Sequence, residues 1–194
     1  MQNILMKRKD LFLALTCIII GFAYRLIPGH PSNITPVAAM ALIGGMYISR
    51  RTLAFVAPIL ALYLGDLVLN NTILRSFFPD HSGLVLWSDY MAFNILAMIA
   101  TVIIGIILSK SNALSKILGG GITSSVAFFV ITNMGAWLTT IIYPKTLTGL
   151  LACFTAGIPF FQNTLLSNFL FITLFVTTIE IVRKYVTKGD LASV

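Results

Sequence analysis

Long apolar stretches alternate with short polar segments along the sequence. The apolar stretches run over residues about 11–27, 34–48, 53–70, 90–109, 117–139 and 163–182. Most of them approach the ~20 residues that a helix needs to cross the ~30 Å hydrocarbon core of a bilayer. The second is short and needs Ile34 and Thr35 to complete a span. The pattern predicts an all-α, polytopic membrane protein with six transmembrane helices, forming a single integral membrane domain over residues 1–194.

Residues 144–162 carry a further apolar pattern between the last two predicted spans. Apolar side chains from Leu147 to Ile158 recur at helical spacing in this segment. A seventh span here would place the basic residues after position 182 on the outer side, against the charge distribution described below. We therefore expect an additional interfacial or re-entrant helix that ends at Pro159.

The composition supports lipid as the solvent for much of the chain. Hydrophobic residues make up 58% of the sequence and charged residues only 10%, whereas soluble domains carry about 25% charged residues. The first apolar stretch follows basic residues, as in a signal peptide, but no small-x-small cleavage pattern precedes Arg25 and five more spans follow. We expect this stretch to remain as the first helix. Cys17 and Cys153 lie in separate apolar stretches and have neither metal-ligand nor disulfide-framework spacing.

The distribution of basic residues predicts the topology. The net charge is +7, and an inward-facing amino terminus places ten of the thirteen lysines and arginines on the cytoplasmic side. These ten are Lys7, Arg8, Lys9, Arg50, Arg51, Lys110, Lys116, Arg183, Lys184 and Lys188. Such a positive-inside pattern predicts a multi-pass protein of the inner membrane with both termini in the cytoplasm. It also accounts for the positive charge without a nucleic acid partner.

The break after the first span holds the first candidate site residues. Pro28, Pro31 and Pro36 prevent a continuous helix here, and irregular backbone at membrane depth lines a cavity or is buried in protein. At ~1.5 Å per residue, Arg25 lies ~22 Å above the start of its helix, and Asp66 is at nearly the same height in the third. Charged residues in a membrane usually mark a functional site. The alternative is an ion pair that only locks two helices together.

Polar residues gather in or just above the outer third of the predicted bundle. They are Arg25, His30, Asn33, Asp66, Asn70, Asn94, Asn133, Asn163 and Asn168. Hydrogen bonds between helices could satisfy the asparagines without a ligand. A one-sided cluster beside broken backbone and aromatic residues also fits a preformed pocket. We select as candidate substrate-binding residues Arg25, His30, Asn33, Asp66, Asn70, Asn133, Trp137 and Asn163.

Small residues line the faces of several predicted helices. In the third span, Ala57, Ala61 and Gly65 recur every four residues. Such a ladder lets another helix approach closely. Gly119 to Gly121 open the fifth span, but no Gly-x-x-x-x-Gly-Lys-Ser/Thr phosphate loop is present, so close packing is the expected use of these glycines.

Several motifs carry a family resemblance over nearly the whole chain. They are Arg-Leu-x-Pro-x-x-Pro-x-Asn-x-Thr-Pro-Val-Ala-Ala at 25–39, Leu-Gly-Asp-Leu at 64–67, Phe-Phe-x-x-Thr-Asn-x-Gly-x-Trp at 128–137 and Ile-Pro-Phe-Phe-x-Asn-Thr-Leu at 158–165. The chain resembles an uncharacterised family of small bacterial six-helix membrane proteins. More distantly, it resembles the substrate-binding S components of energy-coupling factor vitamin transporters.

The more distant resemblance implies a transport protein. It would capture a small, partly polar, vitamin-like molecule in a pocket open to the outside, as a subunit working with a transmembrane scaffold and ATPases. Arg25 would bind an anionic group and Asp66 would orient Arg25 or accept from the ligand. Asn133 and Trp137 would hydrogen-bond to the ligand and stack on it. Because the chain has no nucleotide motif, uphill transport would need that partner or ion coupling.

Two other classes of function remain open at this point. An intramembrane enzyme would need a motif such as Gly-x-Ser-x-Gly or His-Glu-x-x-His, or a second carboxylate near Asp66, and the sequence has none of these. His30 and Asp66 could form an acid/base pair. A non-transporting assembly or scaffold protein would use Arg25 and Asp66 only for structure. We expect no catalytic residue, no metal and no cofactor.

Overall fold

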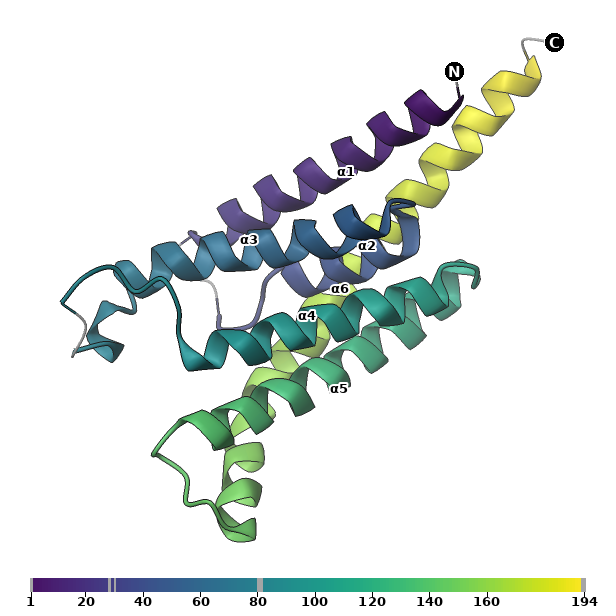
Figure 1. Cartoon of the computed structure of the whole chain (residues 1–194). Coiled ribbons are helices and arrows are strands. Elements are labelled where there is room, and N and C mark those ends of the chain that lie inside the picture. Colours follow the sequence, from purple (N-terminus) through teal and green to yellow (C-terminus); the bar gives the residue numbers. More distant parts are fainter. Residues whose placement is uncertain (1, 28, 30, 80–81, 193–194) are drawn as a thin grey trace.

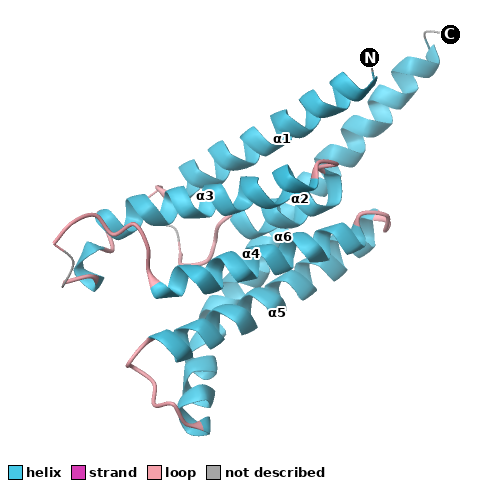
Figure 2. Cartoon of the chain, viewed as in Figure 1, coloured by secondary structure: helices cyan, strands magenta, loops and turns pink. Residues whose placement is uncertain are grey.

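The described residues form a bundle of six α-helices (Figures 1 and 2). The computed structural model describes residues 2–27, 29, 31–79 and 82–192. The helices are α1 (Gln2–Arg25), α2 (Val37–Tyr47), α3 (Arg51–Asn71), α4 (Asp89–Leu108), α5 (Ala113–Thr139) and α6 (Leu147–Ala192), with a short 3-10 helix, η1, at Arg75–Phe77. No strand occurs in the described part of the chain. The predicted all-α fold is therefore confirmed.

Four helices have the length and apolar character of membrane spans. They are α3, α4, α5 and the Leu147–Val182 part of α6. Helix α1 has 24 residues but carries charges near both ends, and α2 is an apolar helix of 11 residues. At ~1.5 Å per residue α2 is only ~16 Å long. The structure thus agrees with a helical membrane protein.

Two elements differ from the sequence prediction. Helix α2 begins at Val37 instead of 34, because Pro36 stands at its N-cap and the preceding residues form an irregular connection. The expected separate helix in residues 144–162 is instead the first part of the 46-residue α6, which continues through Pro159. A proline inside a helix removes one hydrogen bond and bends the axis without necessarily ending the helix. Figure 1 shows the first part of α6 running in a different direction from the rest.

The short helix α2 lies at the centre of the bundle. All of its residues from Val37 to Met46 are buried, as expected for a helix that is apolar all round. Its contact with α4 is made through two glycines: a Cβ added to Gly45 would lie 3.0 Å from Gly105 Cα and 2.9 Å from the Ile106 nitrogen. The two backbones therefore touch at this crossing.

The small-residue ladder of α3 lies against α1. Ala57 and Ala61 are each only 1% exposed, and a Cβ on Gly21 of α1 would lie 3.2 Å from the Ala61 methyl group. The predicted role of the ladder in close helix packing is confirmed. Its partner is a helix of the same chain.

Polar contacts tie the helices at the end of the bundle where both termini lie (Figure 1). Asp10 of α1 is buried and accepts from the backbone nitrogens of Ser49, at 3.1 Å, and Arg50, at 2.9 Å. It thereby satisfies donors at the start of α3. Buried Lys116 of α5 forms an ion pair with Glu180 of α6 at 3.3 Å. These contacts fix α1, α3, α5 and α6 at this end.

The glycine crossing gives the first prediction. Gly45→Ala should lower the free energy of unfolding by about 1–3 kcal/mol, because an added methyl group overpacks the contact between α2 and α4. Gly119→Ala is the matched control, since nothing lies within 4 Å of a Cβ at Gly119. That change should leave the thermal unfolding temperature in detergent unchanged or slightly higher. Equal temperatures for both variants would contradict the close crossing.

Candidate functional site

An ion pair joins the end of α1 to α3. Arg25, the last residue of α1, donates from Nη2 to Asp66 Oδ1. Their side chains are 17% and 12% exposed, respectively. The two residues that the sequence placed at the same depth thus meet directly. The pair removes most of the cost of holding either charge in an apolar bundle.

A glycine makes room for this ion pair. A Cβ added to Gly65 would lie 2.5 Å from Arg25 Nε and 2.7 Å from Arg25 Cδ. The arginine side chain therefore passes directly over the Gly65 backbone to reach the neighbouring Asp66. This explains the order Gly-Asp in the Leu-Gly-Asp-Leu motif, in which glycine serves the ion pair as well as the helix packing.

The connection between α1 and α2 is fastened to α6. Asn163 Nδ2 donates to the Ser32 carbonyl at 3.0 Å. The Ser167 hydroxyl accepts from the Thr35 nitrogen at 3.0 Å and donates to the Thr35 carbonyl at 2.8 Å. Irregular backbone inside a membrane protein requires such partners, because lipid provides none. The connection is therefore held in a defined position.

A cavity of about 270 Å³ lies beneath this connection. Every one of the six α-helices contributes to its wall. Its apolar lining includes Leu62 and Leu69 of α3, Met98 of α4 and Phe128 of α5. The polar lining consists of Arg25, Ser32, Asn33, Thr35, Thr164 and Asn168. A small apolar chamber with a few convergent polar groups is the usual form of a small-molecule site.

Some of the candidate residues selected from the sequence lie at this cavity. Arg25 and Asn33 line it, and Asn33 has a φ of 64° and donates to the Phe160 carbonyl at 3.5 Å. Asp66 holds Arg25, and Asn163 holds the connection at Ser32. The candidate His30 lies outside the described residues.

The structure does not bring the other candidates to the cavity wall. Asn70 is buried in α3 but is not part of the lining. Asn133 donates to the Phe129 carbonyl of its own helix at 2.8 Å, and its side chain fills the space above Gly157.

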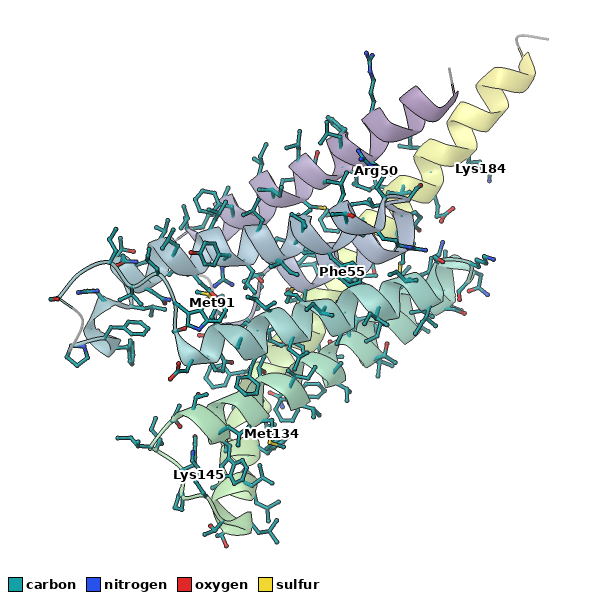
Figure 3. All side chains as sticks on the ribbon, in the orientation of Figure 1. Arg50, Phe55, Met91, Met134, Lys145 and Lys184 are labelled. Carbon is teal, nitrogen blue, oxygen red and sulfur yellow. The ribbon has the colours of Figure 1, made fainter. Side chains whose placement is uncertain are left out.

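Trp137 bonds within the turn between α5 and α6. Its Nε1 donates to the Pro144 carbonyl at 2.9 Å, and Lys145 Nζ lies 5.7 Å from the ring centre. Figure 3 places Lys145 at this turn, at the opposite end of the bundle from Arg50 and Lys184.

No group of three or more histidine, cysteine or acidic side chains that could hold a metal occurs in the described residues.

Asn168 of α6 lines the cavity but was not selected as a site residue from the sequence. It is only 1% exposed, and its Nδ2 donates to the hydroxyls of Ser124, at 3.2 Å, and Ser125, at 2.9 Å. Its depth in the outer third was the only signal in the sequence. The pairing with two serines of α5 depends on how α5 and α6 are rotated, which the sequence does not show.

The ion pair gives the second prediction. Asp66→Leu alone should lower the free energy of unfolding by at least about 2 kcal/mol, because it leaves Arg25 unpaired in a largely buried position. The double variant Arg25→Leu, Asp66→Leu should recover part of this loss, since no charge is left. Thermal unfolding of the two single variants, the double variant and the unmodified protein measures the coupling. Strictly additive losses would show that the two side chains do not stabilise each other.

Comparison with known proteins identifies the family. Residues 6–189 match the model of DUF6580, a family of unknown function. No curated protein and no solved structure matches the chain, so the resemblance to S components gains no support from these searches. Because the family match covers nearly the whole sequence, this six-helix protein belongs to the DUF6580 family.

Proposed function

We propose that this protein binds a small molecule with an anionic group in the cavity beside Arg25, as the substrate-binding subunit of a membrane transporter. The observation that carries the proposal is the cavity of about 270 Å³ with an arginine in a wall built by all six helices. The cavity is partly open, and its wall combines apolar side chains with a few polar groups. This is the usual make-up of a small-molecule site.

The distribution of charges supports an outward-facing cavity. Both chain ends lie at one end of the bundle (Figure 1), and Arg50 and Lys184 lie there too (Figure 3). Arg25 ends α1 and therefore lies toward the opposite end. Under the positive-inside rule, the end with the termini is cytoplasmic. The cavity would then open to the outside of the inner membrane.

A transmembrane scaffold and ATPases belong to this proposal as the source of energy, because the chain itself has no nucleotide-binding motif. The ladder of small residues on α3 is not available for docking to a scaffold. Ala57 and Ala61 are both buried, and Ala61 packs against Gly21 of α1. A scaffold would therefore have to contact another face of the bundle.

A non-transporting assembly protein is the second candidate. The observation that favours it is the direct contact between Arg25 and Asp66, which joins α1 to α3 without any ligand. In that case the pair would be a structural fastening, and the cavity would hold only water or lipid. We propose no catalytic role, because Asp66 pairs with an arginine and no acidic residue pairs with it in the described part of the chain.

Native mass spectrometry of gently purified protein tests the transport proposal. The protein should carry a small molecule from its membrane, and Arg25→Ala should lose at least ~90% of it, since the anionic group has then lost its cation. Lys145→Ala is the matched control, because Lys145 is exposed and donates to the Thr140 carbonyl at the α5–α6 turn. A bare protein that shows no thermal shift with a panel of vitamins and metabolites would favour the assembly protein instead.

The charge-swapped variant Arg25→Asp, Asp66→Arg distinguishes a ligand-binding role of the ion pair from a purely structural one. The swap preserves the opposite charges but moves the cation from α1 to α3. If the variant folds and no longer binds the ligand, the position of the cation matters for binding. Full recovery of both stability and ligand content would show that the pair acts only as a fastening.

A further inference from the structure

The side-chain amide of Asn168 lies in the most enclosed part of the polar lining. Asn168 is 1% exposed, and its two partners on α5, Ser124 and Ser125, are completely buried. A buried amide has two donor hydrogens and an acceptor oxygen to satisfy. Each of these atoms therefore needs a partner in the protein or in the cavity.

The two serines determine which way this amide points. The Ser124 hydroxyl donates to the Gly120 carbonyl at 2.5 Å, and the Ser125 hydroxyl donates to the Gly121 carbonyl at 2.7 Å. Each hydroxyl has one proton to donate, and with that proton on the glycine carbonyl it accepts from Asn168 Nδ2. The nitrogen of the amide therefore faces the serines. Oδ1 consequently points away from α5.

Oδ1 of Asn168 has no hydrogen-bond partner among the described residues, although it is buried. An unsatisfied buried acceptor costs about 1–3 kcal/mol, and such atoms are rare in native proteins. Asn168 also lines the cavity to which Arg25 contributes. A donor group that reaches Oδ1 from this cavity would remove that cost.

We infer that Asn168 Oδ1 accepts a hydrogen bond from an N–H or O–H group of the bound molecule. This inference rests on the proposed binding function and narrows its substrate class. The ligand has an anionic group for Arg25, an apolar body for Leu62, Met98 and Phe128, and a hydrogen-bond donor for Asn168. It enters a space of about 270 Å³, which suits a molecule with one or two small rings.

The arrangement predicts strong discrimination between a donor and a methylated donor. A site built to bond an N–H or O–H group rejects an analogue that lacks it, because the buried polar group is then left unpaired. The dissociation constant should rise by about tenfold or more when the donor hydrogen is replaced by a methyl group. The serines hold the amide, so it cannot turn its nitrogen toward the ligand to compensate.

Two pairs of aromatic acids serve as probes. Indole-3-carboxylate is compared with 1-methylindole-3-carboxylate, and 4-hydroxybenzoate with 4-methoxybenzoate. Each pair keeps the carboxylate and the ring and replaces the donor hydrogen by a methyl group. Dissociation constants come from thermal-shift titrations of the full chain in detergent. In the unmodified protein, the member with the donor should bind about tenfold more tightly or better.

Two substitutions at the same position separate recognition from folding. Asn168→Leu should remove the preference for the donor, while Ser124 and Ser125 keep their bonds to the α5 carbonyls. Asn168→Gln retains an amide with both a donor and an acceptor and should restore at least part of the preference. Thr123→Val is the control, because the Thr123 hydroxyl bonds to the Gly119 carbonyl of its own helix and Thr123 is exposed. This control should behave as the unmodified protein.

The possible failures are distinguishable. If the acids bind in an Arg25-dependent manner but both members of each pair bind equally, the role of Asn168 is overturned and the proposed binding function stands. The same conclusion follows if Asn168→Leu retains the preference for the donor. If none of the four acids binds, or if Arg25→Ala binds them as well as the unmodified protein does, the binding function itself fails and the role of Asn168 fails with it.

Discussion

The ion pair between Arg25 and Asp66 determines the shape of the end of the bundle that holds the cavity. A charge within a membrane protein needs a partner, and here Arg25 and Asp66 are each other's partner. The pair works only because α3 has Gly65 where the arginine crosses it. Its consequence is geometric. The last residue of α1 is fixed against α3, so the irregular connection to α2 starts from a fixed point above the cavity.

The second constraint is the need to satisfy the backbone of that connection. Prolines and an asparagine with positive φ prevent it from forming a helix, and Asn163 and Ser167 of α6 supply the missing hydrogen bonds. The connection thus becomes part of the cavity wall. The packing of α6 against it also explains why so many polar residues of α6 lie at this end.

The two ends of the bundle differ in whether their buried polar groups all have partners. At the end with the termini, Asp10 satisfies the start of α3 and Lys116 pairs with Glu180. These contacts are complete within the protein and account for structure alone. At the cavity, Asn168 Oδ1 is buried without a partner in the described part of the chain. An incomplete polar lining of this kind is the physical basis for proposing a ligand at one end and none at the other.

The sequence by itself determined the membrane character, the approximate position of most helices and the equal depth of Arg25 and Asp66. These properties follow from local composition and from a constant rise per residue, so they can be counted along the chain. Only the tertiary structure decided which polar residues face the cavity. Asn133 and Trp137 donate their side-chain hydrogen bonds to nearby backbone carbonyls, whereas Asn168 lines the cavity wall. The structure also showed that α6 continues through Pro159. The reason is that depth is a property of one helix, while the direction in which a side chain points depends on the rotation of that helix against its neighbours.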